Sequence, residues 1–427
     1  MKADAGRTYR AYPTGGQDRI LTGWGHTARA LWNVALEQRV YLWKQRRHSL
    51  RSAEQCRQLT VARGDLDWIE DFPAQAGQQI LRQLDRSYDN FWNPAHSARF
   101  PARKKRGDRL SIPFPGQAVE VRKLNRRWGE VRLPKLGWLR FRLSRAVGGM
   151  IRNATVSRDG RGWHISFGVH TGRKPDAPNG KPPCGVDFGV AASAYVSTET
   201  EPRLTPPTLT ANEKRRLKHL EQKKARQLTY AKKHQGGKYG RRLRTTIAQI
   251  AKLTARRAAR RRDFTHKLTT DLAKSHGLIG IEDLRVKNMS KSAKGSVEAP
   301  GKNVRAKAGL NRSILDNTPG ERRRQLEYKT HAYGSVLVAV PPFHTSRTCA
   351  RCGRVDPDSR KGCGRLFACA HCGHEDDADH NASMEIEARA RRTGGSDINS
   401  TRSAPEARVP ADGRRRMREA PKPVRTS

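Results

Sequence analysis

The chain has 427 residues, and its 86 Lys and Arg against 40 Asp and Glu leave a formal charge of +46. At roughly 150 residues per domain, this length allows about three compact units with cores of their own. So large an excess of one charge repels itself in a compact protein, so a polyanion such as nucleic acid is the expected partner. The sequence argues against a membrane protein, because no apolar run approaches the roughly 18 residues that a span requires.

Residues 17–95 are predicted to be helical. Apolar residues recur there at three- and four-residue spacing, which gives a helix one apolar face: Ala76, Ile80, Leu84, Tyr88, Phe91 and Trp92. Trp24, Trp32 and Trp43 indicate a second, aromatic-rich helix. Tryptophans can stack on nucleobases, but packing between short helices is the favoured interpretation of these three.

Beyond the basic connector FPARKKRGDR, the apolar pattern changes to a period of two, which is typical of strands. The alternating residues are Leu110, Ile112 and Phe114, then Leu139, Phe141 and Leu143, then Trp163, Ile165, Phe167 and Val169. Short strands separated by Gly and Pro predict an antiparallel sheet or a small barrel to about residue 170. The linker GRKPDAPNGKPP then separates this sheet from the rest of the chain.

From Cys184 the pattern is that of an α/β region. Strands are predicted around Asp187, at 194–196, at 278–284 and at 335–341, where Val336 to Val340 form the longest apolar run and indicate a buried strand. A basic helical region runs from Glu213 to about Lys274, and its 19 Lys or Arg against two Glu up to Arg262 predict contact with a phosphate backbone. The stretch 288–312 is predicted to be a flexible loop.

Two CxxC pairs, Cys349 with Cys352 and Cys369 with Cys372, are separated by sixteen residues. This spacing is typical of a four-thiolate zinc site, and four thiolates leave no open position for water, so the predicted zinc is structural. Cys363 lies between the pairs and could offer another ligand, although a spare thiol is the favoured interpretation. An iron–sulfur cluster is the alternative to zinc.

Three acids stand in contexts that suit catalysis. Asp187 lies on an apolar strand, Glu282 ends another strand, and Asp379 starts a short helix. A carboxylate on an apolar strand costs free energy unless it is paired or binds a cation. Together the three would form a magnesium site, since Mg²⁺ prefers oxygen ligands. Taken singly, each is more often a helix cap or a strand-end acid.

Four segments carry a resemblance to a known family: GVDFGVAAS, GIEDLRVKNM, HTSRTCARCG and DDADHNAS. In this order they resemble the hallmark segments of the TnpB family of transposon-encoded proteins, which is similar to the miniature type V CRISPR effectors. The resemblance extends from about residue 7 to 390. The chain has DFGV where a DLG-type run is usual. The cluster of Asp376, Asp377 and Asp379 leaves open which of these acids binds metal, and the spacing to Asn381 favours Asp379.

The resemblance implies a multidomain α+β protein with an RNase-H-like (RuvC) nuclease domain, whose acids Asp187, Glu282 and Asp379 hold catalytic magnesium, with two ions expected. The implied segments are a wedge strand at 1–16, a helical recognition region at 17–99, a wedge β-barrel at 100–180, the nuclease domain with two acids at 181–345, a zinc ribbon binding target nucleic acid at 346–375, the third acid at 376–392 and a disordered tail at 393–427.

The implied function is RNA-guided DNA cleavage: guide RNA pairs with target double-stranded DNA beside a short flanking motif, and one magnesium-dependent site hydrolyses both strands. We expect a cytoplasmic protein that associates with the nucleoid when bound. The alternatives are an RNA-guided DNA-binding regulator with little or no cleavage, a transposase with an acidic triad, and a plain zinc-ribbon nucleic-acid-binding protein. The last leaves the three acidic motifs unexplained.

Overall fold

The computed structural model describes residues 4–96, 98–105, 107, 109–189, 192–204, 208–296, 298–361 and 364–397. The chain divides into two compact units, one of Met1–Pro175 with Thr205–Lys267 and one of Asp176–Leu204 with Leu268–Ser427. Residues 205–267, which the sequence analysis groups with the nuclease domain, therefore cluster with the first unit. Among the described helices, none is both long and apolar enough to cross a membrane.

A seven-stranded antiparallel sheet forms the centre of the first unit, in the order β2-β6-β7-β1-β5-β4-β3. Its strands are β1 (Ala5–Tyr12), β2 (Leu110–Pro115), β3 (Glu120–Lys123), β4 (Trp128–Leu133), β5 (Gly137–Arg142), β6 (Met150–Asp159) and β7 (Gly162–His170). The predicted alternation is confirmed, because the apolar residues of β2 and β7 all point into the core. Alternate side chains of a strand share one face, so the pattern itself sets which face is buried.

Four helices of the first unit lie between β1 and β2 in sequence: α1 (Gly15–Arg46), α2 (Ser52–Asp65), α3 (Asp67–Glu70) and α4 (Ala74–Trp92). Thr14 and Gln17 form a capping box that starts α1. Trp24 and Trp32 are buried, and each indole N–H donates to a backbone carbonyl at 3.1 Å. Packing rather than base stacking is thus confirmed for these two tryptophans.

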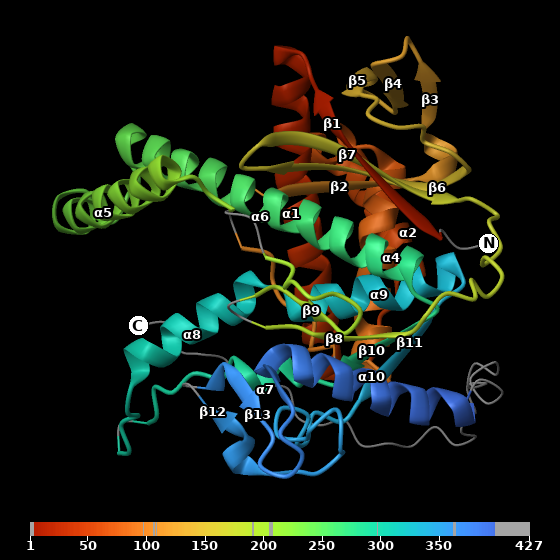
Figure 1. Ribbon diagram of the computed structural model, residues 1–427. Coiled ribbons are helices and arrows are strands. Elements are labelled where there is room, and N and C mark those ends of the chain that lie inside the picture. Colours follow the sequence, from red (N-terminus) through yellow and green to blue (C-terminus); the bar gives the residue numbers. More distant parts are fainter. Residues whose placement is uncertain are drawn as a thin grey trace. The chain divides into compact units, whose positions relative to one another are not determined.

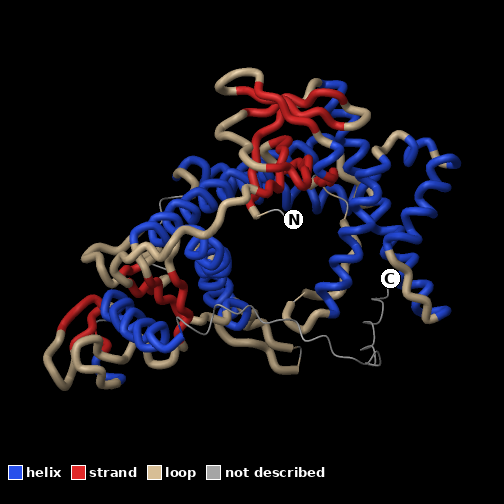
Figure 2. Tube along the Cα trace, turned by 90° about the vertical axis from the view of Figure 1, so that its right-hand side faces the viewer, coloured by secondary structure: helices blue, strands red, loops and turns tan. Residues whose placement is uncertain are grey.

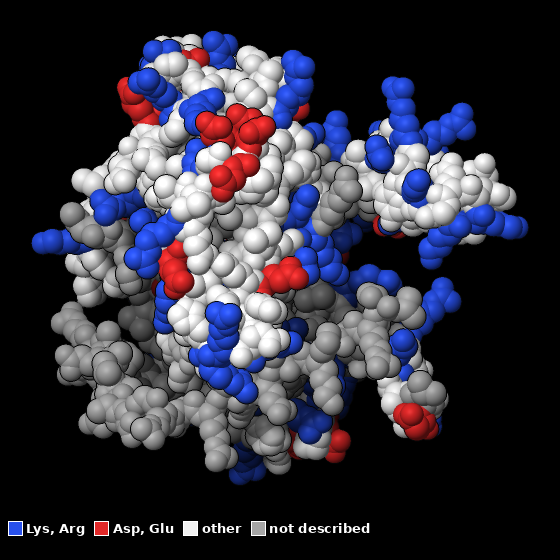
Figure 3. All heavy atoms as spheres, turned by 180° about the vertical axis from the view of Figure 1, so that it is seen from behind, with Lys and Arg blue, Asp and Glu red and all other residues white. Residues whose placement is uncertain are grey.

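The basic region forms two helices, α5 (Ala211–His234) and α6 (Arg241–Ser275), and α6 continues into the second unit after Lys267. Gly236 and Gly237 adopt positive φ values between the helices, where a left-handed backbone favours glycine. Glu213 joins the helices through ion pairs with Arg256 and Arg260. Figure 1 shows α5 extending away from its own sheet, and Figure 3 shows Lys and Arg side chains standing out from this arm.

The second unit contains a mixed four-stranded sheet in the order β11-β10-β8-β9. Its strands are β8 (Cys184–Asp187), β9 (Tyr195–Val196), β10 (Leu278–Glu282) and β11 (Val336–Val340), and only β9 runs antiparallel to its neighbour. The prediction of a buried strand at Val336–Val340 was wrong. β11 is an edge strand in which Val340 alone is buried, because its outer side has no partner strand in the described part of the chain.

The helices of the second unit are α7 (Val286–Met289), α8 (Val304–Asp316), α9 (Pro319–Tyr333) and α10 (Ala378–Asp397). The predicted loop at 288–312 was wrong from Val304 onward, where α8 begins. Only Ile314 of α8 is buried. α10 extends five residues beyond the predicted start of the tail at 393, and residues 398–427 lie outside the described chain.

A small antiparallel sheet, β12 (Arg360–Lys361), β13 (Leu366–Ala368) and β14 (Glu375–Asp377), lies between β11 and α10 in sequence. A 3-10 turn, η2 (Pro357–Ser359), precedes it, and another, η1 (Gly116–Ala118), follows β2 in the first unit. β14 ends directly at the start of α10. The inserted sheet therefore fixes the point at which α10 begins.

Two glycines let α10 pack directly on the sheet of its unit, as Figures 1 and 2 show. A Cβ atom on Gly185 of β8 would overlap the backbone of α10 at Ser383. A Cβ atom on Gly280 of β10 would lie 2.7 Å from the Cβ of Ala390 and 3.0 Å from the carbonyl oxygen of Ile386. Both strands therefore need glycine where the helix crosses them.

Substituting Gly185→Ala is expected to push α10 off the sheet and to destabilise the protein by about 3 kcal/mol, because the overlap is with backbone that cannot rotate away. Chemical denaturation measures this loss. Gly23→Ala, an exposed glycine of α1 with open space at its Cβ position, is the matched control and should be neutral or stabilising. Equal stability of the Gly185→Ala variant and the wild type would contradict the close packing.

Candidate active site and cysteine cluster

The sheet and α10 bring the three predicted acids to one edge of the second unit. Asp187 and Glu282 end the adjacent parallel strands β8 and β10, whose register pairs Val186 with Ile281. The carboxyl ends of parallel strands meet at the same edge, so these two side chains are neighbours. Asp379 is the second residue of α10, and the glycine contacts place the helix over these same two strands.

The charges of Glu282 and Asp379 both act on Asp187. Burial, followed by repulsion from Glu282 and Asp379, raises the pKa of Asp187 to about 7. Burial also raises the pKa of Asp379, although the nearby guanidinium of Arg360 lowers it. Mutual repulsion between buried carboxylates is the condition that a bound cation relieves. The donor set, three carboxylates, suits a hard cation such as Mg²⁺.

The neighbouring acids Asp376 and Asp377 have other partners. Asp377 accepts from the backbone N–H of Asp379 at 2.9 Å and from that of His380 at 3.3 Å, so it caps the start of α10. Its other oxygen accepts from the hydroxyl of Tyr195. Asp376 lies 2.7 Å from Nδ1 of His380. Both Asp379 and Asp377 raise the pKa of Asp187, and Asp379 has the larger effect.

An arginine that the sequence analysis missed lies beside these acids. Arg360, from the inserted sheet, has its Nη2 atom 3.2 Å from Oδ1 of Asp379. It also donates from Nε to the carbonyl oxygen of Gly364 at 3.0 Å, which orients the guanidinium. A positive charge here would also attract a phosphodiester that approaches the acids. Nothing in the sequence separates Arg360 from the chain's many other arginines.

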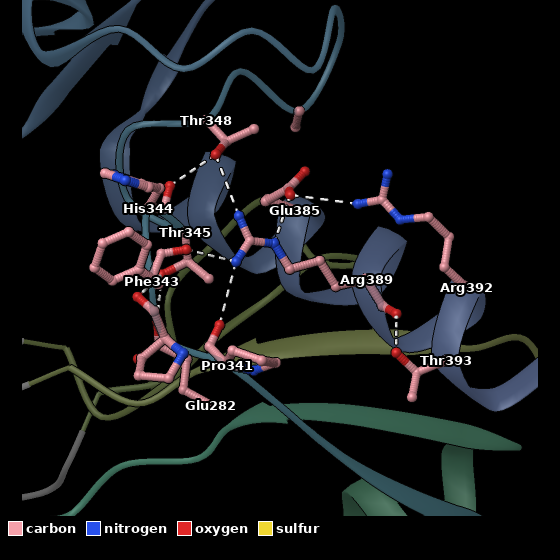
Figure 4. A network of polar contacts seen from close by, with 12 residues as sticks. Glu282, Pro341, Phe343, His344, Thr345, Thr348, Glu385, Arg389, Arg392 and Thr393 are labelled. Atoms are coloured by element: carbon pink, nitrogen blue, oxygen red, sulfur yellow. Dashed lines mark hydrogen bonds and ion pairs between the residues drawn. The ribbon is translucent and has the colours of Figure 1, made fainter. Parts of the chain in front are cut away.

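Two residues that were missed from sequence act on Glu282: Thr345 by a hydrogen bond and Arg389 by its charge (Figure 4). Thr345 donates its hydroxyl hydrogen to the carboxylate of Glu282. Burial raises the pKa of Glu282, while the hydrogen bond from Thr345 and the charge of Arg389 lower it. Thr345 lies 63 residues from Glu282 in sequence, so only the folded chain shows this pairing.

The four predicted cysteines form a tight cluster. The sulfur atoms of Cys349 and Cys372 lie 3.7 Å apart, as do those of Cys352 and Cys369. Four sulfurs at about 2.3 Å from a zinc ion at the centre of a tetrahedron would be about 3.8 Å apart, so the cluster fits a zinc ion. Gly353 and Gly373 follow the two pairs with positive φ, and each donates its N–H back to the first cysteine of its pair.

Among the described residues, these cysteines are the only group of three or more Cys, His, Asp or Glu that could hold a metal with ligand atoms within 4.8 Å of one another. The three acids do not form so tight a group. Cys363, the possible additional ligand, lies outside the described residues. Asn381 of α10 ties the cluster to the acidic edge, since its side chain donates to the carbonyl oxygen of Thr348 and accepts from the N–H of Ala350.

Comparison with known families covers most of the described chain. Residues 1–48 match a family described as a helix-turn-helix domain, and residues 166–293 match one described as a probable transposase. Residues 320–386, which hold the cysteine cluster and Asp379, match the Cas12f1-like TNB domain.

One relative decides the assignment. The protein named "Putative RNA-guided DNA endonuclease InsQ" from Escherichia coli (strain K12) is 39% identical over 323 residues, which cover 75% of this chain and 76% of the relative. This chain belongs to the TnpB family. A relative of the same description from Streptomyces pristinaespiralis is 30% identical over 88% of this chain and 87% of its own length. A solved Cas12f1–sgRNA–target DNA complex aligns with 88% of this chain and 83% of its own at 14% identity and a TM-score of 0.49.

The N-terminal segment of this TnpB-family chain differs from the description of the family it matches. Residues 1–48 contain one strand, β1, and a single unbroken helix, α1, rather than two helices joined by a turn. Gly25 lies inside α1 and does not break the helix. Glycine is needed there because the helix packs against Leu110, and a Cβ atom on residue 25 would lie 2.7 Å from the Cβ of Leu110. The glycine serves packing and is not a turn.

Substituting Cys349→Ser is expected to remove one equivalent of zinc and to lower stability by several kcal/mol, on the order expected when metal binding contributes to folding. Elemental analysis and thermal melting measure the two effects. Cys56→Ser, a half-buried cysteine of α2, is the control and should keep its zinc. A wild-type protein purified without zinc would contradict the prediction.

Proposed function

We propose that this TnpB-family protein is an RNA-guided DNA endonuclease that cuts DNA at the edge formed by β8, β10 and the start of α10. The observation that carries the proposal is that Asp187 and Glu282 end adjacent parallel strands beneath the helix that begins at Asp379's segment, and the raised pKa of Asp187 agrees with it. Relatives named as RNA-guided DNA endonucleases, 39% and 30% identical, support it. Three partly buried acids at one edge, two of which repel the third, are costly for a protein that only binds nucleic acid.

Asp187, Glu282 and Asp379 are the proposed ligands of catalytic magnesium. Bound Mg²⁺ would activate a water molecule and stabilise the leaving oxygen of a phosphodiester, with two ions sharing these tasks. The protein's part is to hold the three carboxylates at fixed positions on two strands and a helix. Arg360 places a positive charge next to Asp379, where it offsets repulsion among the acids and draws a phosphate toward them.

The cysteine cluster is proposed to hold a structural zinc ion. All four tetrahedral positions would be occupied by thiolates, which leaves no place for a reacting water. The hydrogen bonds of Asn381 connect this cluster to the helix that carries Asp379. Zinc would therefore stabilise the segment that sets the position of the third acid, and residues 346–375 would contact target nucleic acid.

The finer architecture is part of the same proposal. The mixed sheet with α10 would be an RNase-H-like (RuvC) nuclease domain, and the seven-stranded sheet with its helices would be a wedge and recognition region. Guide RNA and target DNA are the proposed partners, since a formal charge of +46 calls for polyanions. The arm formed by α5 and α6, which carries 19 Lys or Arg against two Glu between Glu213 and Arg262, is the proposed contact with their phosphates.

Substituting Asp187→Ala is expected to abolish cleavage of both DNA strands together. Loss of a residue that hydrogen-bonds to a metal ligand already lowers metal affinity or activity by roughly 10- to 100-fold, and loss of the ligand itself is expected to lower them further. Target binding should persist, because it depends on base pairing and phosphate contacts. The assay is guided plasmid cleavage with binding measured in parallel, and Asp65→Ala, an exposed acid of α2, is the control. Wild-type cleavage by Asp187→Ala would refute this site.

Removing RNA is expected to lower the melting temperature of the protein. A ligand that binds only the folded state stabilises it by about 2.7 kcal/mol at a hundredfold excess over its dissociation constant, so a shift of roughly 5 °C is expected. Thermal melting at fixed salt, with copurified RNA present or digested away, measures this shift. Identical midpoints without aggregation would argue against RNA as a partner of the folded protein.

A further inference from the structure

We propose that Thr345, held in place by Arg389, is a positioning residue that fixes the carboxylate of Glu282 in the orientation the metal site needs. The inference deepens the proposed function and rests on it. It assigns a task to the Pro341–Thr348 loop, which follows β11 and precedes the first cysteine of the cluster.

The contact between Thr345 and Glu282 is direct and shielded from water. Thr345 is only 2% exposed, and its hydroxyl donates to Oε1 of Glu282. A hydroxyl has one hydrogen, and the other acceptor within reach is the carbonyl oxygen of Pro342 at 3.2 Å. A carboxylate is the stronger acceptor, because bonds to an ionised group are stronger than bonds to a neutral one. One oxygen of Glu282 is therefore held, and the other is left for a metal ion.

Arg389 fastens the loop that carries Thr345 to α10 (Figure 4). Its Nη1 atom donates to the carbonyl oxygens of Phe343 at 2.6 Å and Pro341 at 3.2 Å. Its Nη2 atom donates to the hydroxyl of Thr348 at 3.3 Å. Arg389 thus binds the loop on both sides of Thr345, so the backbone of Thr345 is held at a fixed distance from Glu282.

Glu385 in turn orients Arg389. It lies one helical turn before Arg389 on α10, and its Oε1 atom accepts from Nε of Arg389 at 2.7 Å. Glu385 is 5% exposed, so this charged pair is largely removed from water and its geometry is well defined. All three guanidinium nitrogens are therefore engaged, and a lysine at this position could not make the same set of contacts.

The arrangement links two of the three acids through one helix. α10 carries Asp379 at its start and Arg389 ten residues later, and Arg389 controls the loop that holds Glu282. An acid at the end of a strand can otherwise adopt several side-chain rotamers. Outer hydrogen-bond partners of this kind orient metal ligands, and their loss lowers metal affinity by roughly 10- to 100-fold.

The test compares Thr345→Val, which removes the hydroxyl at similar volume, with Thr345→Ser, which keeps it. Thr330→Val is the matched control, since Thr330 is buried in the same unit and donates only within its own helix α9. Mn²⁺ binding to the RNA-bound protein is followed by the electron paramagnetic resonance signal of the free ion, with Asp187→Ala supplying the background. Guided cleavage, target binding and melting temperature are measured on the same samples.

Thr345→Val should bind Mn²⁺ about 10-fold more weakly and need about 10-fold more Mg²⁺ for half-maximal cleavage. Thr345→Ser should recover most of the Mn²⁺ affinity and most of the wild-type Mg²⁺ requirement. Thr330→Val should match the wild type in both, and target binding should be unchanged in every variant. Wild-type Mn²⁺ affinity in Thr345→Val would overturn the inference. Should that variant fail to fold, Arg389→Lys takes its place: weaker Mn²⁺ binding supports the inference, and unchanged binding overturns it.

A wild-type protein that does not cut, or an Asp187→Ala variant that cuts normally, would instead refute the proposed function. Failure of the proposed function can be distinguished from failure of the inference about Thr345. The proposed function predicts cleavage by the wild type and none by Asp187→Ala, and these two results do not depend on Thr345. A drop in melting temperature with unchanged Mn²⁺ affinity would show a purely structural role for Thr345 and would also overturn the inference.

Discussion

Direct contact between α10 and two glycines of the underlying sheet is the constraint on which the candidate site depends. Gly185 and Gly280 remove the side chains that would otherwise separate the helix from β8 and β10. The first lies two residues before Asp187 and the second two residues before Glu282. The helix is therefore closest to the sheet next to both strand-end acids, and Asp379 at its start is brought to the same edge.

The two candidate metal sites of this unit differ in the way their ligands are held. The cysteines come from two short turns close in sequence, and their sulfur atoms already have the spacing of a tetrahedral site. The acids come from three elements that are distant in sequence, and Glu282 and Asp379 both repel Asp187. A soft, closed thiolate site suits a structural ion, whereas an open carboxylate edge suits an exchangeable one. Asn381 connects the cysteine cluster to the helix that carries Asp379. Loss of order in the cysteine turns is therefore expected to shift the position of Asp379.

Local patterns were enough to predict much of this molecule. Period-two alternation predicted β2 and β7, and the CxxC spacing predicted the cysteine cluster. The grouping of Asp187, Glu282 and Asp379 was expected mainly from the family resemblance, because each acid taken singly is more often a helix cap or a strand-end acid. Local patterns did not predict elements that are buried on only one side, or contacts between residues that are distant in sequence. β11 has a buried strand's composition but lies at an edge, and α8 buries only Ile314. Arg360, Thr345 and Arg389 were missed because the bonds that join them to Asp379, Glu282 and Phe343 span 19, 63 and 46 residues of sequence, which no local spacing encodes.

The central claim is that Asp187, Glu282 and Asp379 form one metal site. Anomalous X-ray diffraction from Mn²⁺ bound to crystals of the protein with its RNA and an uncleavable target tests it most directly. The account predicts an anomalous peak ligated by Asp187 and shared with Glu282 and Asp379, separate from the zinc peak at the cysteines. A manganese peak ligated by Asp376 or Asp377, with none beside Asp187, would contradict it.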